Sequence, residues 1–159
     1  MKNINEDVRM TKEVLISIIG MQFDLSDEGN DIQVVTSGEY YSRGNSQFLL
    51  YEEADEDSGG ITKSMIKFRS DLVELTKKGY VNVHMMFEEG KKNLTNYTTV
   101  FGDILIGIDT KKIAVEETED KIVVGVEYAL DANYEFLADC KIRIEVAPKE
   151  TAGNNIFPL

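Results

Sequence analysis

The sequence contains one cysteine, two prolines, one histidine and no tryptophan among its 159 residues. A single cysteine, Cys140, cannot form an intramolecular disulfide and cannot build a zinc site from several thiolates. Chains without disulfides are typical of reducing compartments, so we expect a cytoplasmic location. Because His84 is the only histidine, Ser-His-Asp or Cys-His catalysis would have to use that one residue.

Long hydrophobic runs are also missing. The longest run, 14–21, is interrupted by Ser17 and Gly20, and it is far shorter than the roughly 18 apolar residues of a membrane-spanning helix. The first seven residues are mostly polar and include two acids, whereas a signal peptide starts with basic residues and continues into an apolar stretch. We therefore expect neither a membrane span nor export.

Positive charge is scarce relative to negative charge. The chain has 17 basic and 29 acidic residues, a formal net charge of -12. Such a surface repels nucleic-acid phosphates and anionic lipids, so we expect no nucleic-acid or membrane partner. The acidic excess is typical of a soluble surface, and a basic protein partner remains open.

Apolar residues at every second position are the main positive signal, and they predict β-strands. The clearest case is near the C-terminus, where one predicted face carries Tyr134, Phe136, Ala138, Cys140, Ile142, Ile144 and Val146. Polar residues occupy most of the opposite face, as in a strand with one buried and one solvated side.

The same alternation predicts ten or eleven strands separated by short turns. We expect them at 14–23, 32–42, 47–53, 61–69, 72–77, 81–88, 93–100, 104–108, 113–115, 122–130 and 134–146. Gly44-Asn45 is the tightest expected hairpin turn. Only residues 5–12 show weak helical spacing, so parallel α/β folds, which need helical crossovers, are not expected.

These strands predict an all-β fold, an antiparallel up-and-down barrel of eight to eleven strands. A barrel is favoured over an open sheet because closure removes exposed edges, and both prolines lie near the C-terminus, where they protect few edges. We expect an N-terminal extension at 1–12, one barrel domain at 13–147 and a tail at 148–159, with Pro148 ending the last strand.

Several stretches resemble the YwiB-like family of bacterial proteins, a group defined by a domain of unknown function. The resemblance covers roughly 14–146, and it rests on the stretches 38–41, 51–53, 59–63, 79–92, 97–102 and 106–111. It implies a calycin-like β-barrel, related in shape to lipocalins and fatty-acid-binding proteins. It implies no catalytic or ligand-binding residues, because the family has none established.

Polar motifs give no specific chemistry. His84 lies on the polar face of its predicted strand, so we expect a surface histidine. The acidic segment 52–60 holds five carboxylates but lacks the EF-hand spacing, so we interpret it, like 116–120, as a solvated acidic loop. No phosphate-binding glycine loop is present, and we expect no catalytic residues, no metal and no cofactor.

The predicted apolar interior is the one feature that suggests a function, because a barrel of about ten strands has room for a small ligand. The positions expected to line such a cavity are Met85, Phe87, Tyr97, Tyr128, Tyr134 and Phe136. Tyr97 would supply a hydroxyl that orients the ligand. A packed core is the competing interpretation. Two functions follow: binding of a small apolar or amphipathic ligand inside the barrel, or a filled barrel that meets a protein partner through its acidic surface. A small enzyme is a weaker third alternative.

Overall fold

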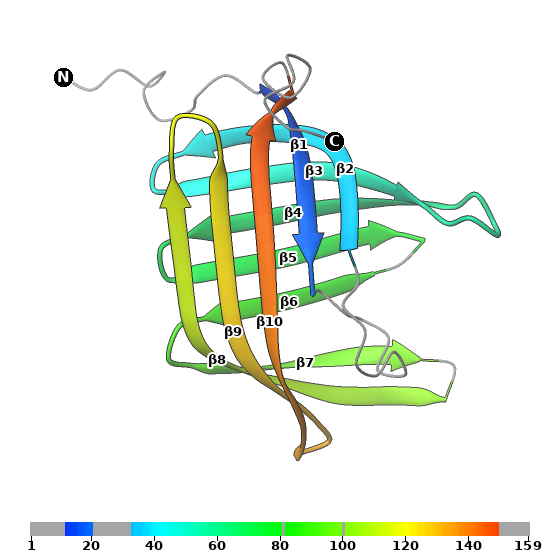
Figure 1. The fold of residues 1–159 in the computed structure, drawn as a ribbon. Helices are drawn as coiled ribbons and strands as arrows, with labels where there is room; N and C mark the ends of the chain where they lie inside the picture. Colours follow the sequence, from blue (N-terminus) through cyan, green and yellow to red (C-terminus); the bar gives the residue numbers. More distant parts are fainter. Residues whose placement is uncertain (1–11, 21–32, 81, 100, 150–159) are drawn as a thin grey trace.

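The computed structural model describes residues 12–20, 33–80, 82–99 and 101–149. The elements in these ranges are ten strands (Figure 1). They are β1 (Lys12–Ile19), β2 (Gln33–Arg43), β3 (Ser46–Ala54), β4 (Ile61–Arg69), β5 (Leu72–Gly79), β6 (Val83–Glu88), β7 (Lys92–Thr99), β8 (Gly102–Glu117), β9 (Ile122–Ala132) and β10 (Glu135–Pro148). Within the described residues, no helix is long and apolar enough to cross a membrane. Most of the expected N-terminal extension, where the weak helical spacing lies, and most of the expected tail are outside these ranges.

All ten strands form one antiparallel sheet in the order β6-β5-β4-β3-β2-β1-β10-β9-β8-β7. Neighbours in this order are also neighbours along the chain, except that β1 pairs with β10. In Figure 1, β9, β10 and β1 run at a steep angle to β3, β4, β5 and β6, and the sheet curves back on itself. The fold is therefore the predicted up-and-down barrel, nearly closed, with ten strands.

The barrel closes between β6 and β7, the two ends of the sheet. The Thr95 hydroxyl donates to the carbonyl oxygen of His84 at 3.0 Å across this seam. At the β6–β7 turn, Gly90 N–H donates to the carbonyl of Thr110, and Thr110 N–H donates to the carbonyl of Lys91. The seam is thus held at its turn end by β8 and elsewhere by side-chain contacts.

Strand β2 turns the corner between the two directions of the barrel. Its first half pairs with β1, and its second half, from Glu39 to Arg43, pairs with β3. The bend is at Gly38, where a Cβ would lie 2.5 Å from the carbonyl oxygen of Leu50 and 2.7 Å from Ile16 Cδ1. Only glycine allows the strands to approach this closely.

One predicted boundary is wrong. The expected strands 104–108 and 113–115 are parts of the single strand β8, which is 16 residues long. Its pairing with β9 shifts between Thr110 and Lys112. Because Lys111 is an extra residue in this strand, Ile113 points inward, although it lies three positions after the inward Thr110. The alternation of apolar residues is interrupted there, but the strand continues.

The alternating apolar residues form one core inside the barrel, as predicted. Its members come from nine strands: Val14, Ile16, Ile18, Tyr40, Leu49, Tyr51, Ile66, Phe68, Val73, Leu75, Met85, Phe87, Ile106, Ile108, Ile113, Val124, Val126, Tyr128, Ile142, Ile144 and Val146. Full burial of one such aliphatic or aromatic side chain stabilises a fold by roughly 1.5–3 kcal/mol. This interior supplies the main stabilisation of the barrel.

The predicted inward face is wrong at the start of β10. Tyr134 and Phe136 are 75% and 66% exposed. The register between β9 and β10 shifts between Phe136 and Ala138, so Phe136 pairs with Asp131, whereas Ala138 pairs with Leu130. Leu137 is the extra residue of this bulge, and the insertion moves the aromatic residues before it to the outer face.

The turn between β9 and β10 is strained. Asn133 and Tyr134 have φ angles of 49° and 69°, the left-handed region that a type I′ hairpin turn requires at both central positions. Asparagine tolerates this region, but a bulky side chain there costs roughly 1–2 kcal/mol. Tyr134 occupies a position where glycine is the usual residue.

A pair of aspartate substitutions tests the inner and outer faces. Ile142 is 2% exposed and Val35 is 61% exposed. We expect Ile142→Asp to lower the free energy of unfolding by more than about 3 kcal/mol, because it buries an unpaired charge. Val35→Asp should cost less than about 1 kcal/mol. Urea unfolding followed by circular dichroism measures both, and equal losses would show that the face assignment is wrong.

Candidate ligand site at the polar end of the barrel

The six residues predicted to line a cavity separate into two groups. Met85, Phe87 and Tyr128 are buried, and Tyr97 is partly buried against the same core. The rings of Phe87 and Tyr128 meet edge to face with centroids 5.0 Å apart. Tyr134 and Phe136 lie on the outer surface and do not join them.

The deep part of the interior is filled by protein side chains. Two rows of paired residues cross β3 to β6 there: Gln47, Phe68, Val73 and Phe87, and then Leu49, Ile66, Leu75 and Met85. Phe68, Phe87 and Leu75 have no exposed surface. This end of the barrel is therefore packed core.

The next row along the same strands is partly polar. It consists of Tyr51, Ser64, Lys77 and Val83, which are paired directly across β3, β4, β5 and β6. Directly paired residues share a face of the sheet, so this row continues the inner lining. One step further, Glu53 pairs with Thr62. The lining thus changes from apolar to polar towards one end of the barrel.

An ion pair lies in this polar lining. Lys77 Nζ is 2.6 Å from Glu53 Oε1, and the two side chains are 11% and 33% exposed. The Ser64 hydroxyl donates to the same carboxylate oxygen at 3.1 Å. Glu53 and Lys77 belong to strands that are not neighbours, and they meet above β4 because Thr62 and Ser64 between them are short.

Tyr51 is held neutral beside this pair. Burial, and then the negative charge of Glu53, raise the pKa of its hydroxyl well above the usual value, and the nearby Ser64 hydroxyl partly offsets the rise. A neutral phenol next to a carboxylate is a hydrogen-bond donor. The cluster of Tyr51, Glu53, Ser64 and Lys77 therefore offers donors and acceptors at the border of an apolar wall.

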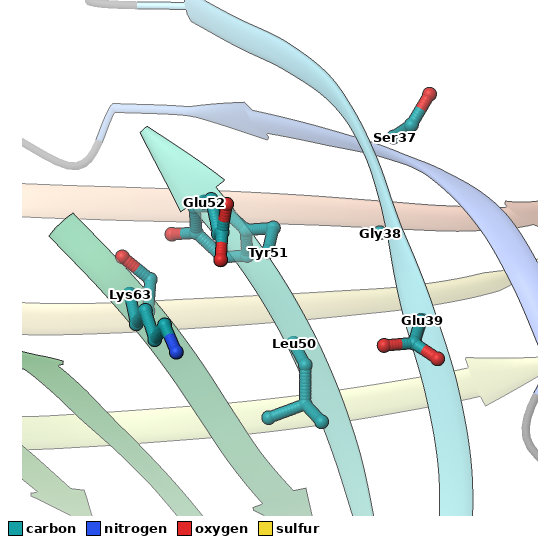
Figure 2. Close-up of a pocket in the computed structure, with 8 residues that line it drawn as sticks. Ser37, Gly38, Glu39, Leu50, Tyr51, Glu52 and Lys63 are labelled. Atoms are coloured by element: carbon teal, nitrogen blue, oxygen red, sulfur yellow. The ribbon is translucent and has the colours of Figure 1, made fainter. Parts of the chain in front are cut away.

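A surface hollow of about 500 Å³ borders two members of this cluster. It lies where β2 leaves β3, beyond the last β2–β3 pair of Glu39 and Leu50. Figure 2 shows Glu39, Glu52 and Lys63 around the opening and Gly38 at the bend of β2. Tyr51 and Ser64 form part of its wall. Glu53 and Lys77 are not among the residues that line it, so the hollow approaches only one side of the cluster.

The sequence interpretation missed Glu53, Ser64 and Lys77. Glu53 ends the predicted strand 47–53 and also falls in the acidic segment 52–60, and Lys77 ends the predicted strand 72–77. Their phase was the available signal, because Lys77 follows Val73 and Leu75 at intervals of two, and Glu53 follows Tyr51 in the same way.

The other polar motifs make local contacts. His84 is an exposed residue on the outer face, as predicted, with Nε2 2.6 Å from Glu74 Oε2. In the acidic loop, the Asp55 carboxylate accepts hydrogen bonds from the Ser58 backbone N–H and hydroxyl, both at 2.8 Å, and these bonds lower the pKa of Asp55. Within the described residues, no three histidine, cysteine, aspartate or glutamate side chains gather to hold a metal ion.

Alkaline unfolding tests the state of the buried tyrosines. Burial raises the pKa of Tyr51 and Tyr128 in the folded state, whereas unfolding returns both to about 10. Their contribution to stability is present below about pH 10 and is lost as the pH rises, by about 1.4 kcal/mol per tyrosine at about pH 11. Tyr51→Phe and Tyr128→Phe should each reduce the loss between about pH 8 and 11 by that amount, measured by urea unfolding at each pH. A loss identical to that of the wild type would contradict the assigned burial.

Comparisons with known proteins agree with this architecture. Residues 16–144 match the family described as a domain of unknown function (DUF1934). The crystal structure of the ywiB protein from Bacillus subtilis superimposes with a TM-score of 0.65 at 21% identity, covering 91% of this chain and 96% of that chain. No curated protein matches the chain. The matched segment spans most of the chain and nearly the whole barrel, and the chain belongs to the DUF1934 family.

Proposed function

We propose that the protein binds a small amphipathic molecule at the polar end of its barrel. The observation that carries this proposal is the Lys77–Glu53 ion pair in the inner lining. An ion pair that has lost most of its water contributes little net stability. A few polar groups that converge beside an apolar wall are, however, the usual composition of a small-molecule site.

The packed core limits the size of the ligand. Because Phe68, Leu75 and Phe87 fill the deep end, an apolar group of the ligand would contact the partly buried residues Val83 and Tyr97 instead. Its polar group would lie against Lys77 and Glu53. A ten-stranded up-and-down barrel is wide enough for one such molecule. This width is a reason to propose that the barrel is calycin-like.

The chemistry of the polar cluster supports a ligand with both donors and acceptors. Lys77 and Ser64 both use oxygen Oε1 of Glu53. Carboxylate oxygens accept more than one hydrogen bond each. Glu53 would therefore accept from a ligand donor, and Lys77 would donate to a ligand acceptor.

A cytoplasmic location is part of the same proposal. It is supported by Cys140, the only cysteine, whose thiol is a poor nucleophile because burial raises its pKa. A chain that folds around a core without disulfides suits a reducing compartment.

A fluorescent fatty acid that carries a dansyl group tests the site. We expect its emission to rise on binding and to fall when decanoic acid or decylamine displaces it. Lys77→Met should weaken binding of the dansyl fatty acid about tenfold, because it removes a charged hydrogen-bond donor and leaves Glu53 to repel the carboxylate. Comparing the two competitors shows which charge the site prefers.

Lys78→Met is the matched control. Lys78 is the next residue along β5 after Lys77, is exposed and does not line the hollow, so its loss should leave binding unchanged. Thermal melts of both variants separate loss of binding from loss of fold. The proposal fails if the folded wild type does not bind the dansyl fatty acid, or if the two variants bind it equally.

A further inference from the structure

The seam between β6 and β7 is the one line around the barrel, within the described residues, that has no backbone ladder. Every other pair of adjacent strands forms one. Strands at such an edge keep unpaired backbone N–H and C=O groups along one side. Between the described residues of β6 and β7, the bond from the Thr95 hydroxyl to the carbonyl oxygen of His84 is the one side-chain hydrogen bond that crosses the seam. The seam is therefore the weakest line of the barrel wall.

The two ends of the seam differ in how firmly they are held. Figure 1 shows β6 and β7 running in opposite directions from their shared turn. At this turn, Glu89 N–H donates to the carbonyl of Asp71, between β4 and β5, and Ile113 N–H of β8 donates to Glu89 Oε2 at 2.8 Å. Further from the turn, the described residues of the two strands share only the Thr95–His84 bond. The seam therefore separates most easily at the end away from the turn.

This loosely held end leads to the candidate ligand site. Beyond the Thr95 contact, the chain continues to Val83 on β6 and to Tyr97 on β7, and both side chains are partly buried against the core. Val83 pairs directly with Lys77, whose side chain is only 11% exposed. The surface hollow at the bend of β2 does not include Lys77 among its lining residues. The Lys77–Glu53 ion pair is therefore approached from the seam, one strand away, and not from that hollow.

The inner face of β7 is polar, which lowers the cost of opening the seam. Asn93 and Thr95 pair with the buried residues Ile108 and Ile106, so they share the inner face with them, and Tyr97 follows two positions later. The amide nitrogen Nδ2 of Asn93 is buried without a hydrogen-bond partner among the described residues. A buried polar group without a partner gains a hydrogen bond when water or a polar ligand group reaches it. An entirely apolar edge would offer no such gain.

We propose that a small amphipathic ligand enters the barrel by separating β6 from β7 at the end away from their turn. This inference rests on the proposed function, because it requires a ligand that binds beside Lys77. Opening here breaks the Thr95–His84 hydrogen bond and no backbone ladder, whereas opening between any other two adjacent strands breaks a row of backbone hydrogen bonds. The ligand then passes Val83 and Tyr97 to reach the ion pair.

A thiol placed inside the seam measures its opening without a ligand. Met85, next to His84 on β6, and Ile66, in the middle of β4, are both buried. In a Cys140→Ser background, we expect a disulfide reagent to modify the thiol introduced by Met85→Cys about tenfold faster than the thiol introduced by Ile66→Cys, because only the second thiol requires unfolding of the whole barrel. Urea unfolding of both variants corrects for differences in overall stability. Equal corrected rates would overturn the proposal.

Thr95→Val tests the route by removing the hydroxyl that crosses the seam. We expect stopped-flow mixing with the dansyl fatty acid to show association and dissociation rates that both rise about threefold or more, with Kd unchanged, because easier opening speeds passage in both directions. Thr98→Val is the matched control. Thr98 lies on the same strand and is exposed, so its substitution should leave both rates at the wild-type values.

The outcomes separate this inference from the proposed function. If the wild type binds the dansyl fatty acid but Thr95→Val leaves both rates unchanged, the ligand does not enter through the seam, and the site beside Lys77 still stands. A change in Kd through the dissociation rate alone also overturns the inference, because Thr95 would then contact the bound ligand. If the wild type does not bind the dansyl fatty acid, both proposals fail.

Discussion

The pairing of β1 with β10 is the contact on which the rest of the structure depends. All other paired strands are consecutive along the chain, so hairpins alone would give two separate sheets, β1 to β6 and β7 to β10. Residues 14–19 of β1 pair with residues 143–148 of β10, which are separated by most of the chain. Bringing such distant segments together costs loop entropy, and burial of Ile16, Ile18 and Ile144 offsets that cost. The β1–β10 pairing joins β1 to β6 and β7 to β10 into one sheet around a shared core.

Once the barrel is closed, the pairing rows determine what each part of the interior can do. The rows through Leu49 and Phe68 are mainly apolar and packed, so they stabilise the fold. The row through Tyr51, Ser64 and Lys77 lies nearer one end of the barrel and carries groups that need hydrogen-bond partners. Because the Lys77–Glu53 ion pair contributes little net stability, the packed rows supply the stability that the polar end lacks. The candidate site is thus a polar stretch in an otherwise apolar and stabilising lining.

The sequence was sufficient for the class of fold because inward residues recur at intervals of two. The interval breaks where one residue is inserted, at Lys111 in β8 and at Leu137 in β10. An insertion of this kind reverses the inward and outward positions on one side of it, and alternation alone does not locate it. For that reason two predicted strands were one, and Tyr134 and Phe136 were placed on the wrong face.

The candidate site was harder to predict than the core for a different reason. Charged residues at strand ends resemble loop residues. The charge of Glu53 and Lys77 therefore concealed their inward position, which the two-residue alternation indicates. Met85, Phe87 and Tyr128 were placed correctly inside because apolar character and phase agreed. Which inward residues contact each other depends on the register between strands, and the register is set by turns and bulges that pairing reveals only in three dimensions.

The bulge at Leu137 decides which β10 residues line the end of the barrel. If the alternation continued without it, the rings of Tyr134 and Phe136 would point inward. With the bulge, Glu135 pairs with the inward Ala132 and takes that position, whereas Ala138 stays inward beside Leu130. One inserted residue thus removes two aromatic rings from the interior and leaves an exposed carboxylate at its rim, because Glu135 is exposed.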